Sequence, residues 1–229
     1  MPGPRPVHNQ TRREAVVQEL RRAIIAGELE SGQPVREVHV AAQMGVSRPT
    51  LREAVYELIH EGLLEQEPYR GIVVASIDEK FITDVADVRV ALETLAARSV
   101  AADPDGRSKE IVVEAWQAYQ AAHRSQNVER LHQAHVDLHR SIWFASGNSM
   151  LKRIWPAVEA SFDVAIGLDE PVRGDPERAF QLHRQLVDTI LTGDADAIEA
   201  ELEHHARQSA DELIRIIADR ARSDTSASA

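Results

Sequence analysis

Residues 45–54, whose sequence is Gly-Val-Ser-Arg-Pro-Thr-Leu-Arg-Glu-Ala, constrain the fold of this chain more than any other stretch. Gly45 can adopt the left-handed backbone conformation that a tight turn between two helices requires. Ser47 can cap the next helix through its hydroxyl group, and Pro49 is tolerated in the first turn of that helix. The pattern predicts a helix-turn-helix, although an ordinary helical corner with its arginines in solvent would share these features.

The residues on either side favour a winged form of this motif. Residues 35–44 place apolar side chains at helical spacing, and residues 54–59 continue an apolar face until Gly62, which can end the helix. Two strand-like runs follow at 63–67 and 71–75, which predicts a β-hairpin. Helices followed by a hairpin form the order of elements in a winged helix-turn-helix, which is a DNA-binding fold.

Arginines occur where such a fold would meet DNA. Arg48, Thr50 and Arg52 project from the start of the second helix, which is the end that enters a major groove in this motif. Arginine can bind both the edge of a guanine base and the backbone phosphates. Arg70 gives the hairpin a basic tip.

Over residues 12–75 the chain resembles the GntR family of bacterial transcription regulators. The matching residues are Leu20 to Leu29, Gly32, Val35 to Glu37, Gly45 to Arg48, Leu51 to Ala54, Glu61 to Leu63, Arg70 and Gly71. The resemblance implies DNA contacts from residues at the helix starts and in the hairpin, namely Arg36, Ser47, Arg48, Thr50, Arg52, Arg70 and Gly71.

Composition limits the other possibilities. The chain has no cysteine, which excludes a disulfide framework, a thiolate metal site and a cysteine nucleophile. No apolar run approaches the ~20 residues needed to cross a membrane, and residues 1–6 lack the apolar stretch of a secretion signal. We therefore expect a soluble, cytoplasmic protein.

The net charge of −11 is unevenly distributed. Residues 1–70 contain nine arginines and ten acidic residues, so the excess of acidic side chains lies downstream of them. A basic DNA-binding face must therefore come from the arrangement of the arginines rather than from their excess, and DNA binding should be sensitive to salt.

The chain is expected to be mainly α-helical, with two domains between two tails. The predicted parts are a disordered tail at 1–11, a winged helix-turn-helix with a small β-hairpin at 12–76, an all-helical effector-binding and dimerisation domain at 77–222, and a disordered tail at 223–229. Six helical patterns without a strand pattern predict an antiparallel six-helix bundle for the second domain. We expect its core to contain the aromatic residues Trp143, Phe144, Trp155 and Phe162.

Four histidines of the second domain form a candidate metal site. His135 and His139 are four residues apart, so both lie on one face of a helix and can bind one ion. His183 and His205, from two further helices, could complete the site without cysteine. Imidazole ligands suit zinc, nickel, copper or iron. Unrelated surface or hydrogen-bonded histidines would give the same pattern in a chain that has ten of them.

This second domain resembles the all-helical effector domain of the FadR branch of the GntR family, which is called the FCD domain. The matching segments are 138–142, 145–148, 182–190 and 193–197, followed by His205. The resemblance implies that His139, His183 and His205 are metal ligands. The family usually has aspartate where this chain has His135, and the loss of that negative charge favours zinc or nickel over a hard ion such as manganese, unless metal binding itself has been lost.

Arg89 is the candidate effector-binding residue. The segment from Arg89 to Glu93 matches the family's Arg-x-x-Leu-Glu signature, which implies that Arg89 binds a carboxylate in the effector pocket. A guanidinium group can hold a carboxylate with two parallel hydrogen bonds. Alternatively, Arg89 pairs with Glu93 on a solvated helix face.

These features together predict a ligand-responsive transcription regulator, a repressor that is not an enzyme. We expect a homodimer that binds a pseudo-palindromic operator in double-stranded DNA, with a small organic acid as effector and no association with membranes. The alternative from a different class is a metal-dependent hydrolase built on the helical bundle, because a histidine site with an open position can activate water.

Overall fold

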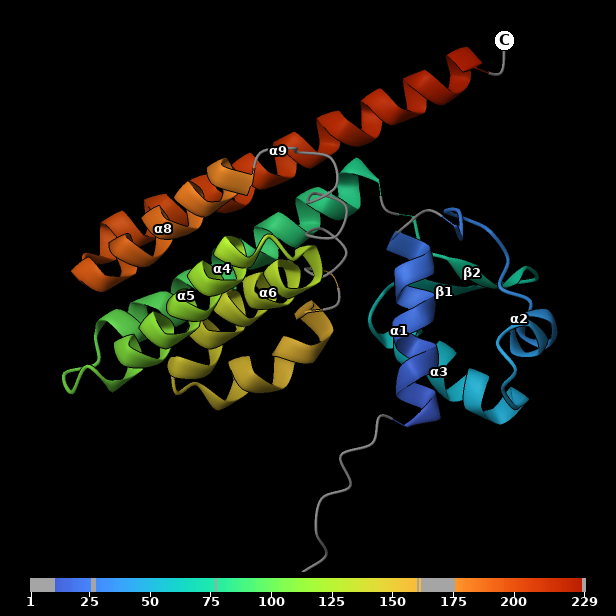
Figure 1. Cartoon of the computed structure of the whole chain (residues 1–229), viewed down its shortest axis with the longest axis horizontal. Helices are drawn as coiled ribbons and strands as arrows, with labels where there is room; N and C mark the ends of the chain where they lie inside the picture. The colour runs from blue at the N-terminus through green and yellow to red at the C-terminus, as the bar shows by residue number, and fades with distance from the viewer. Residues whose placement is uncertain (1–10, 26–27, 77, 160, 162–175, 228–229) are drawn as a thin grey trace, which may run out of the picture. The chain divides into compact units, whose positions relative to one another are not determined.

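The computed structural model describes residues 11–25, 28–76, 78–159, 161 and 176–227. The chain divides into two compact units, Met1–Ser76 and Ile77–Ala229. Figure 1 shows the helices and the two-stranded sheet of these units. The predicted tail at 1–11 lies outside the described residues except for Thr11.

The first unit is a winged helix-turn-helix. Its elements are α1 (Arg12–Ile25), α2 (Glu37–Gln43), α3 (Arg48–His60), β1 (Leu64–Glu67) and β2 (Gly71–Val74). The strands pair antiparallel with Leu64 opposite Val74, and Pro34 forms an additional bridge with Val73. The core of the unit is made by buried apolar side chains of α1, α3 and the hairpin, including Val17, Leu20, Leu51, Leu58, Leu63 and Val73.

The turn between α2 and α3 has the geometry that its sequence predicts. Gly45 has a φ of 63°, in the left-handed region where a β-carbon is unfavourable. The hydroxyl oxygen of Ser47 accepts a hydrogen bond from the backbone N–H of Thr50 at 3.3 Å, which caps α3. Gly62, which follows α3, also has a positive φ of 76°. The turn therefore sets the orientation of α3 through local backbone chemistry.

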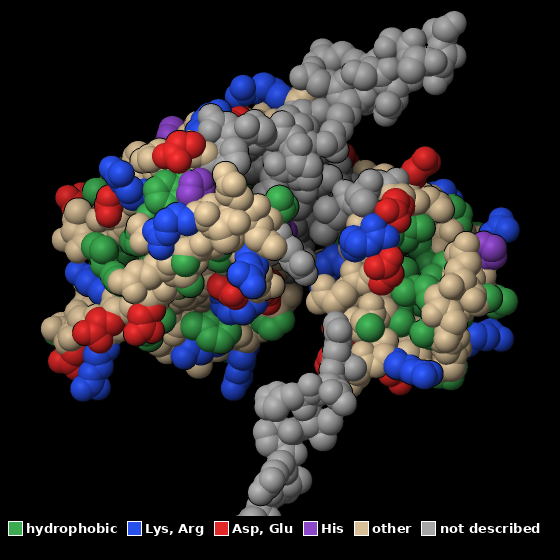
Figure 2. Space-filling model, in the orientation of Figure 1, with side chains coloured by type: hydrophobic (Ala, Val, Ile, Leu, Met, Phe, Trp, Pro, Cys, Tyr) green, Lys and Arg blue, Asp and Glu red, His purple; other side chains and the backbone are tan. Residues whose placement is uncertain are grey.

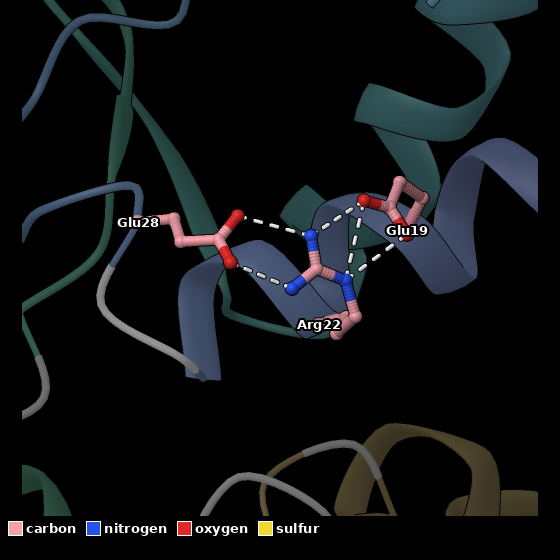
Figure 3. A network of polar contacts seen from close by, with 3 residues as sticks. All are labelled: Glu19, Arg22 and Glu28. Carbon is pink, nitrogen blue, oxygen red and sulfur yellow. Dashed lines mark hydrogen bonds and ion pairs between the residues drawn. The ribbon is translucent and has the colours of Figure 1, made fainter.

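A surface ion-pair network links the end of α1 to the segment that follows it (Figure 3). The guanidinium group of Arg22 contacts the carboxylate of Glu19 at 2.6 Å and that of Glu28 at 2.7 Å. Hydrogen bonds from Arg22 lower the pKa of both carboxyl groups, and the same bonds raise the pKa of Arg22. All three side chains are solvent-exposed, so the network adds little to stability.

The second unit consists, in its described residues, of helices joined by short turns, with no strand among them. Its elements are α4 (Glu79–Ala101), α5 (Arg107–Ser125), α6 (Val128–Ala145), a helix over 149–159, α8 (Pro176–Thr192) and α9 (Ala195–Ala227). Three helices start at side-chain caps: Asp78 accepts from the N–H of Phe81, Asn127 from that of Arg130, and Asp194 from that of Ala197. The predicted helical domain is thus confirmed.

The core of this unit contains two of the four aromatic residues expected there. Trp143 and Trp155 are buried and pack edge to face, with ring centroids 5.2 Å apart. The prediction for Phe144 was wrong, because its side chain is 41% exposed. Phe144 follows the buried Trp143 directly, and neighbouring side chains in a helix point about 100° apart. Phe162 lies outside the described residues.

The predicted C-terminal tail begins too early. Helix α9 continues to Ala227, so residues 223–227 are helical rather than disordered, and residues 228–229 lie outside the described part. The sequence after Arg222 contains neither glycine nor proline, and its serine, aspartate and threonine residues are only modestly unfavourable in a helix.

Among the described residues, no helix is long and apolar enough to cross a membrane.

Replacing Gly45 with alanine tests the role of the turn. A β-carbon built at Gly45 meets nothing within 4 Å, so any cost must come from the backbone conformation rather than from a clash. We expect Gly45→Ala to destabilise the first unit by about 1–2 kcal/mol. All three tryptophans lie in the second unit, so hydrogen exchange of the α2 and α3 amides is the suitable measurement. Equal amide protection in this variant and in the control Gln43→Ala would contradict the prediction.

Candidate DNA-binding surface and metal centre

The residues expected to contact DNA lie at the surface of the first unit. Arg48 is the first residue of α3, and Arg52 follows one turn later on the same face of the helix. Both side chains are exposed, as is that of Arg36, which precedes α2. Within the described part of the chain, neither Arg36 nor Arg48 forms an ion pair. Ser47 and Thr50, whose hydroxyl oxygens are 2.8 Å apart, complete this end of α3.

Arg52 and Arg70 each form an ion pair with a glutamate. The Nε atom of Arg52 lies 3.1 Å from a carboxylate oxygen of Glu37 on α2. Arg70 pairs with Glu67 at 2.7 Å and donates a hydrogen bond to the carbonyl oxygen of Gly32 at 3.3 Å. Gly71 follows Arg70 with a φ of 80°, so the hairpin tip is shaped by backbone conformation as well as by the ion pair. The glutamate partners were missed in the sequence analysis.

Charges on this unit are mixed rather than segregated. On the face shown in Figure 2, basic and acidic side chains are interspersed and do not form one continuous basic patch. This agrees with the near balance of arginine and acidic residues in the first 70 positions. The face in view therefore presents individually placed arginines rather than a basic patch.

Three of the four predicted metal ligands come together inside the second unit. His135 and His139 lie one turn apart on α6, and His183 comes from α8. One ligand nitrogen from each of these three rings lies within 4.8 Å of the other two, and we call this group the histidine cluster. His205, on α9, has its ring centroid 4.8 Å from that of His183 and 5.5 Å from that of His139, but it is not part of the three-ligand group.

Other acidic and histidine residues near the cluster in sequence do not contribute to it. His204 is exposed, as its position 100° away from His205 on the helix predicts. Asp137 points toward Arg140, whose guanidinium group lies 2.7 Å from its carboxylate. The ring of Tyr119, on α5, packs against those of His135 and His183 with centroid distances of 5.9 and 5.1 Å, a contact that no pattern in the sequence indicated.

The chemistry of His183 suits a metal ligand. Its Nδ1 atom lies 2.7 Å from the carbonyl oxygen of Ala179, which fixes the ring and places the proton on Nδ1. Its Nε2 atom is buried and has no hydrogen-bond partner among the described residues. Burial, together with nearby His139 and Arg89, lowers the pKa of His183 to about 3. The ring is therefore neutral at pH 7, with an unused lone pair, which is the form that binds metals.

The pKa of His135 is lowered in the same way as that of His183. Burial lowers its pKa well below the usual range, and neighbouring His183, His139 and Arg89 add to this effect. Neutral imidazoles bind zinc at about 2.0–2.1 Å, which places tetrahedral ligand nitrogens roughly 3.3 Å apart. The ligand nitrogens would have to move closer than their present spacing of up to 4.8 Å, but a buried set of imidazoles is the chemistry that such an ion prefers, so the residues present fit a metal ion.

Glu93 connects the histidine cluster to Arg89. Its carboxylate is fully buried, with one oxygen 3.0 Å from Nδ1 of His139 and 3.4 Å from the indole nitrogen of Trp143. The other oxygen lies 3.6 Å from the guanidinium group of Arg89. Burial alone would raise the pKa of Glu93, but interactions with His139, Arg89 and Trp143 outweigh burial and lower it to about 2. Glu93 is therefore ionised.

Arg89 is buried beside the same histidines. It pairs with Glu93, as one reading of the sequence proposed, but the pair is buried in the helical unit and not on a solvated face. Its Nη2 atom also lies 3.4 Å from Nε2 of His139. The sequence signature identified Arg89 and Glu93 as a pair, but their shared contact with His139 depends on how α4 packs against α6.

Comparison with known protein families identifies both units. Residues 12–74 match the model for bacterial regulatory proteins of the gntR family, and residues 84–208 match the model for the FCD domain. Both descriptions agree with the folds seen in the two units.

Several relatives that match most of the chain are named as transcription regulators. The chain is 33% identical over 184 residues to a protein of Paenarthrobacter nicotinovorans named "Probable D-xylose utilization operon transcriptional repressor", covering 80% of each protein. It is 29% identical over 185 residues to the gluconate operon transcriptional repressor of Bacillus subtilis, covering 78% of this chain and 75% of that protein. These relatives are regulators rather than enzymes, which removes the support for the hydrolase alternative.

Solved structures show the same fold. A GntR transcriptional regulator from Rhodococcus sp. RHA1 has a TM-score of 0.67 at 19% identity, with 89% of this chain and 97% of that chain covered. A solved FCD domain described as metal-free has a TM-score of 0.52 at 20% identity and covers 63% of this chain and 99% of its own length. The chain therefore belongs to the GntR family of bacterial transcription regulators, with a winged helix-turn-helix followed by an FCD domain.

Proposed function

We propose that this regulator is a repressor whose FCD domain binds a divalent metal ion and a small organic acid, and whose affinity for its operator depends on that acid. The observation that carries the proposal is the histidine cluster, in which three ligand nitrogens from two helices lie within 4.8 Å of one another. Surface histidines without a shared role would not converge in this way inside a domain core.

Zinc or nickel is the expected metal. The cluster supplies only imidazole nitrogens, which these ions prefer, whereas manganese and magnesium favour oxygen ligands. His205 would be the fourth ligand, since its ring lies beside those of His139 and His183 and a small side-chain movement would bring it to the ion. The bound ion would act as an electrophile that attracts an anionic ligand.

Arg89 would hold the carboxylate of the effector. Its guanidinium group is buried next to the histidine cluster, so an acid bound there could contact the metal and the arginine together. The name of one relative connects that protein with the gluconate operon, and gluconate is a small organic acid. A carboxylate effector is therefore chemically reasonable for this chain.

The first domain would read a pseudo-palindromic operator as part of a homodimer. Two copies related by two-fold symmetry present two α3 helices to two half-sites, as regulators with this motif do. Arg48 and Arg52 would contact bases or phosphates, while Arg36, Thr50, Ser47, Arg70 and Gly71 would position the domain on the duplex. The effector would change DNA affinity by a few kcal/mol at most.

Replacing Arg48 with alanine tests operator recognition. Arg48 is exposed at the start of α3, so its loss should not alter folding. We expect operator binding to weaken by roughly 1–3 kcal/mol, as for the loss of one good base contact. Binding is measured by fluorescence anisotropy with DNA from upstream of the regulator's own gene. Arg124→Ala, which removes an exposed arginine of α5, is the control for net charge. Equal affinities for the two variants would contradict the assignment.

Replacing His183 with alanine tests the metal site. A ligand that binds only the folded state raises its stability, by about 2.7 kcal/mol at a hundredfold excess over Kd. We expect zinc to raise the Tm of the wild-type protein and to have little effect on His183→Ala. His204→Ala removes an exposed histidine close to the site and should respond to zinc like the wild type. Wild-type protein that contains no stoichiometric metal and gains no stability from zinc or nickel would refute the proposed centre.

Replacing Arg89 with lysine tests the effector site. Lysine keeps the positive charge but cannot make two parallel hydrogen bonds, so it should weaken the response to an acid without abolishing DNA binding. Arg89→Ala should bind the operator and no longer respond. The measurement is operator affinity with and without D-gluconate or another acid found to affect the wild type. Variants that respond like the wild type would place the effector elsewhere.

A further inference from the structure

We infer that Arg89 and the metal ion compete for the same nitrogen of His139, so that metal binding releases Arg89 and thereby forms the acid-binding site. This inference rests on the proposed function, because it assumes that the histidine cluster binds metal. It adds an order to the two binding events: the metal binds first, and the acid binds only after Arg89 has been displaced.

The ring of His139 has only one nitrogen to offer a metal. In the neutral ring that binds metals, the proton belongs on Nδ1, which faces a carboxylate oxygen of Glu93 at 3.0 Å. Its Nε2 atom must then bear the lone pair. Because a guanidinium group can only donate, the contact between Arg89 and Nε2 at 3.4 Å uses that lone pair. The nitrogen that would bind the metal is therefore occupied by Arg89.

A metal ion and the guanidinium group of Arg89 cannot both contact Nε2 of His139 in this geometry. A zinc ion bound along the lone pair would lie about 2.0–2.1 Å from Nε2, which is inside the space between Nε2 and the guanidinium nitrogen. The ion and Arg89 are also both positively charged, and in a buried site such charges repel strongly. Metal binding must consequently move the guanidinium group away from His139.

Glu93 limits how far Arg89 can move. Its second carboxylate oxygen lies 3.6 Å from the guanidinium group, and both residues are on α4, one turn apart. Arg89 can leave His139 and still interact with Glu93, which keeps its remaining N–H donors close to the ion. In the metal-free cluster, Glu93 and Arg89 offset each other's charge. A divalent ion adds two positive charges, which favours an anion such as a carboxylate as the next ligand.

The zinc affinity of Arg89→Met tests this competition. Methionine removes the charge and the donors but keeps a long side chain that fills the space. Removing the competing contact should lower the Kd for zinc roughly tenfold or more. The reason is that the loss of a hydrogen bond from a charged donor changes an equilibrium constant by at least about that factor. The Kd is measured by competition with a chromogenic chelator. Arg98→Met, which removes a half-exposed arginine of α4 paired with Glu199, should bind zinc like the wild type.

The outcomes separate this inference from the proposed function. Tighter binding in Arg89→Met, with an unchanged Kd in Arg98→Met, supports the competition. A Kd that is unchanged or weaker in Arg89→Met overturns the inference while leaving the metal centre in place. Failure of the wild-type protein to bind zinc overturns both.

A second measurement uses the wild-type protein, so it does not depend on the folding of a variant. Titration of zinc, without any acid, should shift the NMR signal of the Arg89 side-chain Nε–H, which is identified by its absence in Arg89→Lys. D-gluconate should then bind the zinc-loaded protein and not the chelator-treated protein, with uncharged D-glucitol as the control. An Arg89 signal that does not move when zinc binds would overturn the inference.

Discussion

The arrangement of the FCD domain depends on the contacts of one buried carboxylate, that of Glu93. An ionised carboxylate in a protein core is strongly destabilising unless charged or polar groups surround it, and here three side chains do so. His139 and Trp143 lie one turn apart on α6, and Arg89 lies one turn before Glu93 on α4. The need to satisfy one carboxylate thus fixes α4 against α6 and sets the ring of His139 in one orientation.

The winged helix-turn-helix could be predicted almost completely from the sequence because its signals are local. Gly45, Ser47 and Gly62 act through their own backbone or through a neighbour three residues away, and such effects do not depend on the rest of the fold. The end of α9 was misplaced because no strong stop signal follows Arg222. The partners of Arg52 and Arg70 were missed, since surface ion pairs depend on side-chain placement rather than on a pattern.

The histidine cluster was predictable only in part. Spacing placed His135 and His139 on one helix face, but their meeting with His183 was inferred from the family resemblance, because spacing within one helix says nothing about the next. The link from Glu93 to His139 joins residues 46 positions apart and depends on the packing of two helices. Phe144 shows the same limit, since hydrophobicity alone did not determine which face of α6 is buried.

In the ion pair between Arg52 and Glu37, the carboxylate of Glu37 occupies the guanidinium group in the way that a DNA phosphate would. An arginine that already holds a carboxylate gains little from a backbone phosphate, and it releases fewer bound counterions when the exchange occurs. Under the proposed function, non-specific binding, which relies on backbone phosphates, would therefore gain little from Arg52. The hydrogen bonds to Glu37 use the Nε atom of Arg52, so under the proposed function its terminal nitrogens could still contact a base that accepts two hydrogen bonds. An acidic residue on this face would then favour discrimination between sites at the expense of total affinity.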